Sequence, residues 1–333
     1  MLAFRLVSLA SIVIATHGDV TGTAPPAPGA ERGRPIVLVV HGRGQLGRDT
    51  AEIRRDALRA LQGGARTLTG DSLLRSDDVR LVWYADLLDS RAQRAASTAC
   101  VDADSLEREH AESSEPNALR LLASLAGAII DAAAEESPGD GGLDARRIGS
   151  DLRYLADPET RCAARLRVSH ALRDAAREGR PIILVAHSFG AFVAWDHLRL
   201  RVARAGAMLP PVTRFVTMGS PLGSMELRQL VFGEEPALLS LPVAVSGWTN
   251  VIGTGDPFAM RITEPDSSGT TMSRSLADMY AGPELDEPHQ LASYLHDAAT
   301  ARVVLGAWCD AFSKAPRSIQ GSCGKLGASA TPR

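Results

Sequence analysis

Short apolar runs alternate with longer mixed stretches along most of the chain. Two of the runs, Ile36–Val40 and Ile182–Ala186, are apolar at every position, which is typical of strands buried on both faces of a sheet. More mixed runs predict three further strands, at 79–84, 213–218 and 248–252. The first of these follows Ile36–Val40 at the spacing of a strand–helix–strand unit, which predicts a parallel sheet. We therefore expect a doubly wound α/β fold with a mostly parallel sheet.

The stretches between the runs predict helices and one insertion. Asp49 is placed to cap a helix over 50–61 whose apolar residues share one face. Two more helices are expected at about 161–177 and 293–312. Between about 86 and 142 the chain is polar, charged and rich in alanine, so this stretch predicts a helical insertion packed on the main domain.

A serine flanked by small residues follows the strand Ile182–Ala186. Ser188 has Ala186 two positions before it and Gly190 two positions after it, and an apolar helical pattern begins there. Small neighbours are needed because the strand and the helix pass close together at such a turn, which strains the serine backbone and exposes its hydroxyl. The pattern predicts a nucleophilic serine. The alternative is an ordinary strand–helix junction with an incidental serine.

The segment 186–190 resembles the nucleophile elbow of the α/β-hydrolase superfamily, with alanine in place of the first glycine of Gly-x-Ser-x-Gly. The resemblance covers about 35–312 and implies a sheet of the α/β-hydrolase type. It also implies a catalytic triad in the chain order Ser, Asp or Glu, His, with each residue at the carboxyl end of a strand. Residues 39–45 and 286–295 carry the resemblance further, whereas the insertion at 86–142 has no counterpart in the family.

A serine nucleophile needs a histidine to accept its proton and a carboxylate to orient that histidine. Asp256 lies in a glycine-rich turn just after the strand 248–252, where the resemblance places the acid; its alternative role is that of a turn residue before proline. His289 follows an acidic, proline-containing loop and precedes the last helix, as the base does in serine esterases of this type. Weaker candidates are Glu264, Asp278 and Asp286 for the acid and His296 for the base.

The developing oxyanion needs backbone N–H donors. Phe189, directly after the nucleophile, would supply one, and Arg43 or Gly42 in the loop after the first strand would supply the other. The pair His41-Gly42 after a buried strand resembles the oxyanion segment of lipases and esterases. The same loop matches Gly-x-Gly-x-x-Gly over 42–47, but no acidic residue ends a strand about 20 residues later, which disfavours dinucleotide binding.

The composition limits the functions that this chain can have. The chain has 333 residues, of which 45% are hydrophobic, so it can bury a large core. A formal net charge of −3 does not indicate the excess of basic residues that is typical of nucleic-acid-binding proteins. No metal-ligand spacing is present, and the expected chemistry needs no cofactor.

The amino-terminal region predicts export. A short charged start, an apolar run from Leu6 to Ala15 and small residues after it have the layout of a secretory signal peptide. We assign 1–24 to this signal, with the cleavage site left open, 25–34 to a linker and 35–312 to the hydrolase domain. Residues 313–333 are expected to form an irregular tail. A secreted or periplasmic location follows.

Four cysteines suit an exported protein, because an even number permits two disulfides. Of the three possible connectivities, we favour Cys309 with Cys323, which would attach the carboxyl-terminal tail. Cys100 with Cys162 would then tie the insertion to the helix before the elbow.

The sequence thus predicts an exported hydrolase of carboxylic esters that acts on a small-molecule or lipid substrate. The apolar segment 238–241, within a stretch where lids commonly sit, favours lipid esters, and contact with a membrane surface stays open. The alternatives are an acyltransferase or thioesterase built on the same triad, and a hydrolase-fold binding protein without catalytic activity.

Overall fold

The computed structural model describes residues 33–88, 154, 158–200, 210–224, 227–228, 241–262, 276–282, 285 and 287–328. Contacts divide the chain into two units, Met1–Ala30 and Glu31–Arg333, and all described residues belong to the second unit. The expected signal peptide, most of the linker and insertion, residues 238–240 of the apolar segment 238–241 and the last five residues lie outside the described residues.

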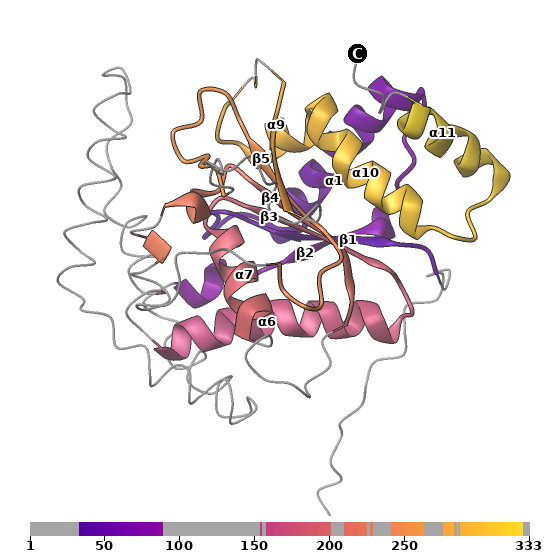
Figure 1. The fold of residues 1–333 in the computed structure, drawn as a ribbon. Coiled ribbons are helices and arrows are strands. Elements are labelled where there is room, and N and C mark those ends of the chain that lie inside the picture. The colour runs from indigo at the N-terminus through magenta and orange to yellow at the C-terminus, as the bar shows by residue number, and fades with distance from the viewer. Residues whose placement is uncertain are drawn as a thin grey trace, which may run out of the picture. The chain divides into compact units, whose positions relative to one another are not determined.

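Six parallel strands form one sheet in the order β2-β1-β3-β4-β5-β6 (Figure 1). Their bounds are Ile36–Val40 for β1, Val79–Val82 for β2, Ile182–His187 for β3, Val212–Met218 for β4, Trp248–Ile252 for β5 and Leu276–Tyr280 for β6. Every residue of β1, β3 and β5 is buried, as expected for central strands of a parallel sheet. The sheet confirms the predicted α/β class, and β6 adds an edge strand that the sequence pattern did not predict.

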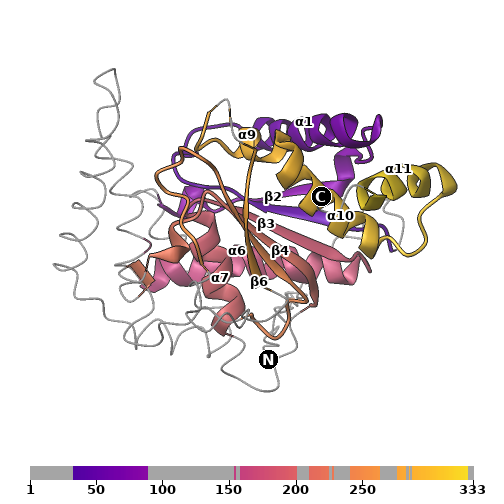
Figure 2. The ribbon, with the colours of Figure 1, turned by 45° about the horizontal axis from the view of Figure 1, so that its top comes forward.

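Helices cover both faces of the sheet (Figures 1 and 2). One face carries α6 (Pro158–Arg177) and α7 (Gly190–Leu200), and the other carries α1 (Thr50–Thr69), α9 (Leu291–His296), α10 (Ala298–Ala311) and α11 (Arg317–Ala328). Alternate residues of each strand point to opposite faces: Leu38 of β1 packs in the first core and Val39 in the second. Short 3₁₀ helices at Ser76–Asp78, Ala85–Leu88 and Pro221–Gly223 complete the described elements.

The carboxyl-terminal part differs from the sequence prediction in two ways. The expected helix over 293–312 is two helices, because Asp297 ends α9 and caps α10 by accepting a hydrogen bond from Thr300 N at 2.8 Å. The expected irregular tail contains α11 instead. The predicted disulfide between Cys309 and Cys323 is present and ties α11 to α10. The other predicted pairing involves Cys100, which lies outside the described residues.

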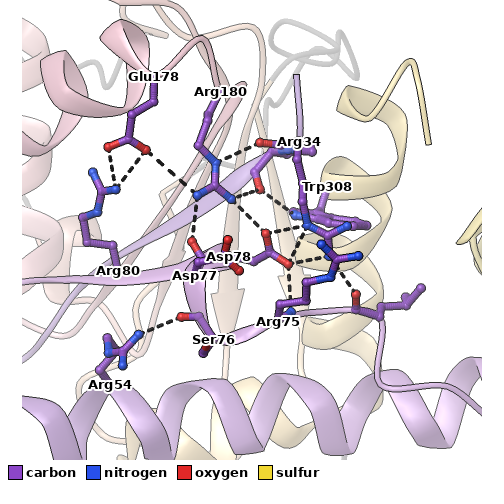
Figure 3. Close-up of polar contacts among 12 residues, drawn as sticks. Arg34, Arg54, Arg75, Ser76, Asp77, Asp78, Arg80, Glu178, Arg180 and Trp308 are labelled. Atoms are coloured by element: carbon purple, nitrogen blue, oxygen red, sulfur yellow. Dashed lines mark hydrogen bonds and ion pairs between the residues drawn. The ribbon is translucent and has the colours of Figure 1, made fainter. Parts of the chain in front are cut away.

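A buried ionic network joins the amino ends of the three strands β1, β2 and β3 (Figure 3). Asp78 is fully buried, and Arg34 Nε donates to its two carboxylate oxygens at 2.7 and 3.0 Å. Arg180 Nη2 donates to the same carboxylate at 2.8 Å. Other N–H groups of this guanidinium donate to the backbone carbonyls of Arg34, Pro35 and Asp77. The network therefore fixes the strand ends opposite the edge at which the predicted site lies.

The same network reaches helix α10. Trp308 Nε1 donates to the Pro35 carbonyl at 3.0 Å, and the Arg34 guanidinium lies 5.0 Å from the centre of the Trp308 indole (Figure 3). A cation held over an indole face gains further stabilisation. Within the described residues, no helix is both long enough and apolar enough to cross a membrane.

Candidate active site

The carboxyl edge of the sheet brings together loops that are far apart in the sequence. Strands β1 and β3 are neighbours, and the chain continues from them in opposite directions across the sheet, to β2 on one side and β4 on the other. Such a reversal opens a crevice at the carboxyl ends of the two strands, where ligands of doubly wound folds bind. The predicted elbow after β3 and the predicted oxyanion loop after β1 flank this point.

Ser188 has the strained backbone that the sequence predicts. Its φ is 52°, in the left-handed region that non-glycine residues rarely adopt. Ser188 N donates to the Met218 carbonyl at 2.9 Å, which fixes the turn against the end of β4. Gly190 begins α7 so close to β1 that a Cβ there would lie 2.8 Å from the Val40 carbonyl oxygen. Close packing of strand and helix therefore holds the serine in this conformation.

The structure brings the three predicted triad residues into one hydrogen-bonded chain. Ser188 Oγ lies 2.9 Å from His289 Nε2, and His289 Nδ1 lies 2.9 Å from each carboxylate oxygen of Asp256. An ionised carboxylate only accepts, so Nδ1 carries the proton of the neutral imidazole and Nε2 is left to accept the serine proton. The Asp256 side chain is fully buried, whereas the His289 side chain is 29% exposed. This arrangement can activate a serine.

Two further donors hold the Asp256 carboxylate. Phe258 N donates to Oδ1 at 2.9 Å, and the Tyr294 hydroxyl donates to Oδ2 at 2.6 Å. Burial by itself would raise the pKa of Asp256, but the hydrogen bonds from His289 and Tyr294 outweigh it and hold this pKa below its usual value. The carboxylate is therefore ionised at neutral pH.

The loop after β1 packs directly against the elbow. A Cβ on Gly42 would lie 2.9 Å from Ser188 Cβ and 2.7 Å from His187 Nδ1, so only glycine fits there without displacement. His41 Nδ1 donates to the Gly42 carbonyl at 2.7 Å, and His41 Nε2 accepts from Tyr84 N at 3.3 Å. The loop is thus held beside the serine. The roles predicted for Phe189, Arg43 and Gly42 as oxyanion donors stay predictions.

Two buried histidines next to the site are uncharged at neutral pH. Burial lowers the pKa of His41 to about 4. Burial, together with the neighbouring His289, lowers the pKa of His187 to about 3. The ring of His187 lies 5.0 Å from that of His289. Of these three histidines, only His289 contacts the serine hydroxyl and is partly exposed to solvent.

The rim of the site combines an aromatic ring and a cation. The Phe258 ring lies 4.6 Å from the His289 ring, and the Arg43 guanidinium lies 5.0 Å from the Phe258 ring centre. Sequence reasoning missed the contacts of Phe258 and Tyr294 because they bridge loops that come together only in the folded sheet. For Tyr294 the available signal was its place five residues after His289, in the segment that resembles esterases.

The weaker candidates lie elsewhere. His296 is exposed and packs beside Gly63 of α1. Asp278 lies within β6, where it accepts hydrogen bonds from Asn250 Nδ2 and Ile262 N. Glu264 and Asp286 lie outside the described residues. No group of side chains in the described part of the chain has the composition of a metal site.

Comparisons with family models, with curated proteins and with solved structures found no match for this chain. The arguments for its function therefore come from its own residues and their geometry.

Proposed function

We propose that this protein is a serine hydrolase of the α/β-hydrolase type that cleaves carboxylic esters through an acyl-enzyme. The observation that carries the proposal is the hydrogen-bonded chain from Ser188 through His289 to Asp256. The positive φ of Ser188 supports it, because strain of this kind at the end of a central strand is typical of a nucleophile held for reaction.

The reaction follows from these positions. As Ser188 Oγ bonds to the ester carbonyl carbon, its proton passes to His289 Nε2, and the carbonyl electron pair moves onto the oxygen. The backbone N–H groups of Phe189 and Arg43 stabilise this oxyanion. When the carbonyl re-forms, the bond to the alcohol breaks and His289 returns the proton to the leaving oxygen. Water then repeats the two steps on the acyl-enzyme, releasing the acid and restoring Ser188.

Asp256 stabilises the imidazolium that forms in each step. Its carboxylate is buried and accepts a hydrogen bond from His289 Nδ1–H. The positive charge on the ring therefore develops beside a fixed negative charge. The aspartate keeps the ring in the tautomer that presents Nε2 to the serine. It does not itself take up the proton.

The disulfide between Cys309 and Cys323 is compatible with an extracellular location. We include export in the proposal, supported by the signal-peptide pattern of residues 1–24. The preferred ester and its chain length are left to the substrate screen below.

The proposal is tested by labelling the purified protein with a fluorophosphonate, which forms a P–O bond with an activated serine and releases fluoride. We expect one adduct per chain, mapped to Ser188 by peptide mass spectrometry. Labelling should be lost in Ser188→Ala and reduced at least a hundredfold in His289→Ala, because the serine then has no base. His296→Ala is the matched control and should label like the wild type.

The other function classes give different results. A binding protein of the same fold would not label, with or without detergent, and would keep its function in Ser188→Ala. An acyltransferase or thioesterase would label equally. A screen of p-nitrophenyl esters of increasing chain length, thioesters and added alcohols separates these two from an ester hydrolase. Faster release of thiol than of alcohol, or acyl transfer in preference to hydrolysis, would contradict the ester-hydrolase assignment.

A further inference from the structure

Tyr294 connects the end of β5 to the acid of the proposed triad. Its hydroxyl donates to Asp256 Oδ2 at 2.6 Å and accepts from Gly253 N at 2.9 Å. The side chain is fully buried, and both partners are buried as well. Burial raises the pKa of this hydroxyl, and the hydrogen bond to the carboxylate adds to the effect, so the tyrosine stays protonated and remains a donor.

Two glycines make room for this side chain. Gly219, after β4, has a φ of +55°, and a Cβ there would lie 2.7 Å from Asp256 Oδ2 and 3.0 Å from Tyr294 Cε2. A Cβ on Gly253, after β5, would lie even closer to the tyrosine hydroxyl. The ends of two neighbouring strands therefore shape a slot in which a ring from α9 reaches the carboxylate. The contact is part of the packing of the sheet edge and does not depend on a surface side chain.

We propose that Tyr294 is a positioning residue that fixes the Asp256 carboxylate and thereby sets the proton affinity of His289. The inference rests on the proposed function, because it assigns a role within that triad. Phe258 N holds Oδ1 and the tyrosine hydroxyl holds Oδ2, so the carboxylate cannot rotate away from the imidazole. Outer hydrogen-bond partners of metal ligands change activity about ten- to a hundredfold when removed, and we expect an effect of that size here.

The sign of the effect follows from the hydrogen bond. A donor on the carboxylate draws off part of its negative charge, which weakens its hold on the imidazolium proton. Without that donor, the Asp256 charge is less compensated and His289 becomes easier to protonate. The neutral imidazole is the active form, so the acid limb of the rate profile should move to higher pH in Tyr294→Phe.

Other groups that face the histidine do not interfere with this readout. His187, on β3, has a pKa of about 3 and stays neutral above pH 5. His41, before the loop after β1, stays neutral there as well, with a pKa of about 4. Arg43, whose guanidinium lies over the Phe258 ring that contacts His289, carries the fixed charge of an arginine. Their charges are therefore the same in the wild type and in the variant.

The test measures the second-order rate of fluorophosphonate labelling of Ser188 from pH 5 to pH 9 in the wild type and Tyr294→Phe. We expect the plateau rate to fall ten- to a hundredfold and the acid limb to move to higher pH. Tyr154→Phe is the matched control, because Tyr154 is also fully buried and donates to a buried carboxylate, Asp196 Oδ2, at 2.9 Å. It should leave the acid limb in place, even if it lowers the stability of the protein.

A second readout does not depend on activity. The imidazole of His289 is titrated by NMR in both proteins, with His289→Gln used to assign its resonance. If the wild type labels but Tyr294→Phe has an unchanged acid limb and an unchanged His289 titration, the inference is wrong while the proposed function stands. If the wild type does not label, the proposed function fails, and the NMR titration alone decides the inference. An unchanged titration overturns it.

A further variant serves if Tyr294→Phe does not fold. Gly219→Ala places a methyl group between the carboxylate and the tyrosine ring and leaves the hydroxyl in the chain. It should move the His289 titration in the same direction. A titration identical to that of the wild type in folded Gly219→Ala would overturn the inference.

Discussion

Lowering the pH from 7 to 5 is expected to destabilise the folded protein because two histidines beside the site are buried without charge. His41 is 1% exposed and His187 is 6% exposed. Their pKa values are about 4 and about 3 in the folded protein, below the ordinary value of 6.5, and burial is the largest cause for both. In the unfolded chain both side chains are hydrated and take up protons near pH 6.5.

The pKa values give the sign and the size of the effect. The folded pKa is depressed for both groups, so their contribution to stability is fully present above pH 6.5 and is lost as the pH falls toward 4 and 3. Between these limits the unfolded state binds about two more protons than the folded state, and stability changes by roughly 2.7 kcal/mol per pH unit. From pH 7 to pH 5 each histidine removes roughly 2 kcal/mol. His170, whose pKa burial also lowers, adds to the loss.

Urea unfolding followed by intrinsic fluorescence at half-unit steps from pH 7 to pH 5 measures this slope. His187→Phe removes one of the two groups and should reduce the slope by about one proton. His296→Gln is the control, because that histidine is exposed and its replacement should leave the slope unchanged. A wild-type slope below one proton, about 1.4 kcal/mol per pH unit, would refute the reasoning, since the two histidines could then not both be buried without charge.

Two more predictions concern the opposite edges of the sheet. Asp78→Asn removes the countercharge of two buried guanidinium groups and should cost about 3–5 kcal/mol in urea unfolding, with no change in the labelling rate of Ser188 in the folded protein. A cost below about 1 kcal/mol would contradict this. Gly42→Ala should lower the labelling rate about ten- to a hundredfold, because its methyl group would overlap the elbow and shift the loop. Gly306→Ala, with no atom within 4 Å of the added Cβ, is the control, and equal rates in the two variants would exclude a role for this close packing.

Five of the six strands could be predicted from the sequence, and the edge strand β6 could not. Strands β1, β3 and β5 are buried along their whole length, and their mostly apolar sequences can be recognised without knowledge of the tertiary structure. Strand β6 lies at the edge of the sheet and is mostly exposed or half-buried, so its pattern is weak. The break between α9 and α10 was missed because the helical pattern of apolar residues continues on both sides of Asp297. Its cap also depends on distant Gly282, whose N–H donates to the same carboxylate at 2.9 Å.

The triad geometry could be predicted because parallel strands place their carboxyl ends at one edge. Chain order and the position after a strand favoured Asp256, and the resemblance to serine esterases favoured His289. The structure brings both together with Ser188. The partners of Asp256 could not be predicted in the same way. Tyr294 reaches the carboxylate only because Gly219 and the end of β5 leave space for its ring. That space is a property of the assembled sheet edge.

The three buried aspartates of the described chain show why the proposed chemistry belongs at one edge. Asp78 and Asp196 are fully buried, and both are held by arginine side chains. Arginine keeps its proton at any pH a protein survives, so these pairs can fix strands and helices but cannot transfer a proton. Asp256 is held by a tyrosine hydroxyl, a backbone N–H and His289, and of these partners only the imidazole is a side chain that proteins use as a general base. Because His289 also lies against Ser188, this carboxylate alone among the three acts on a group that can react.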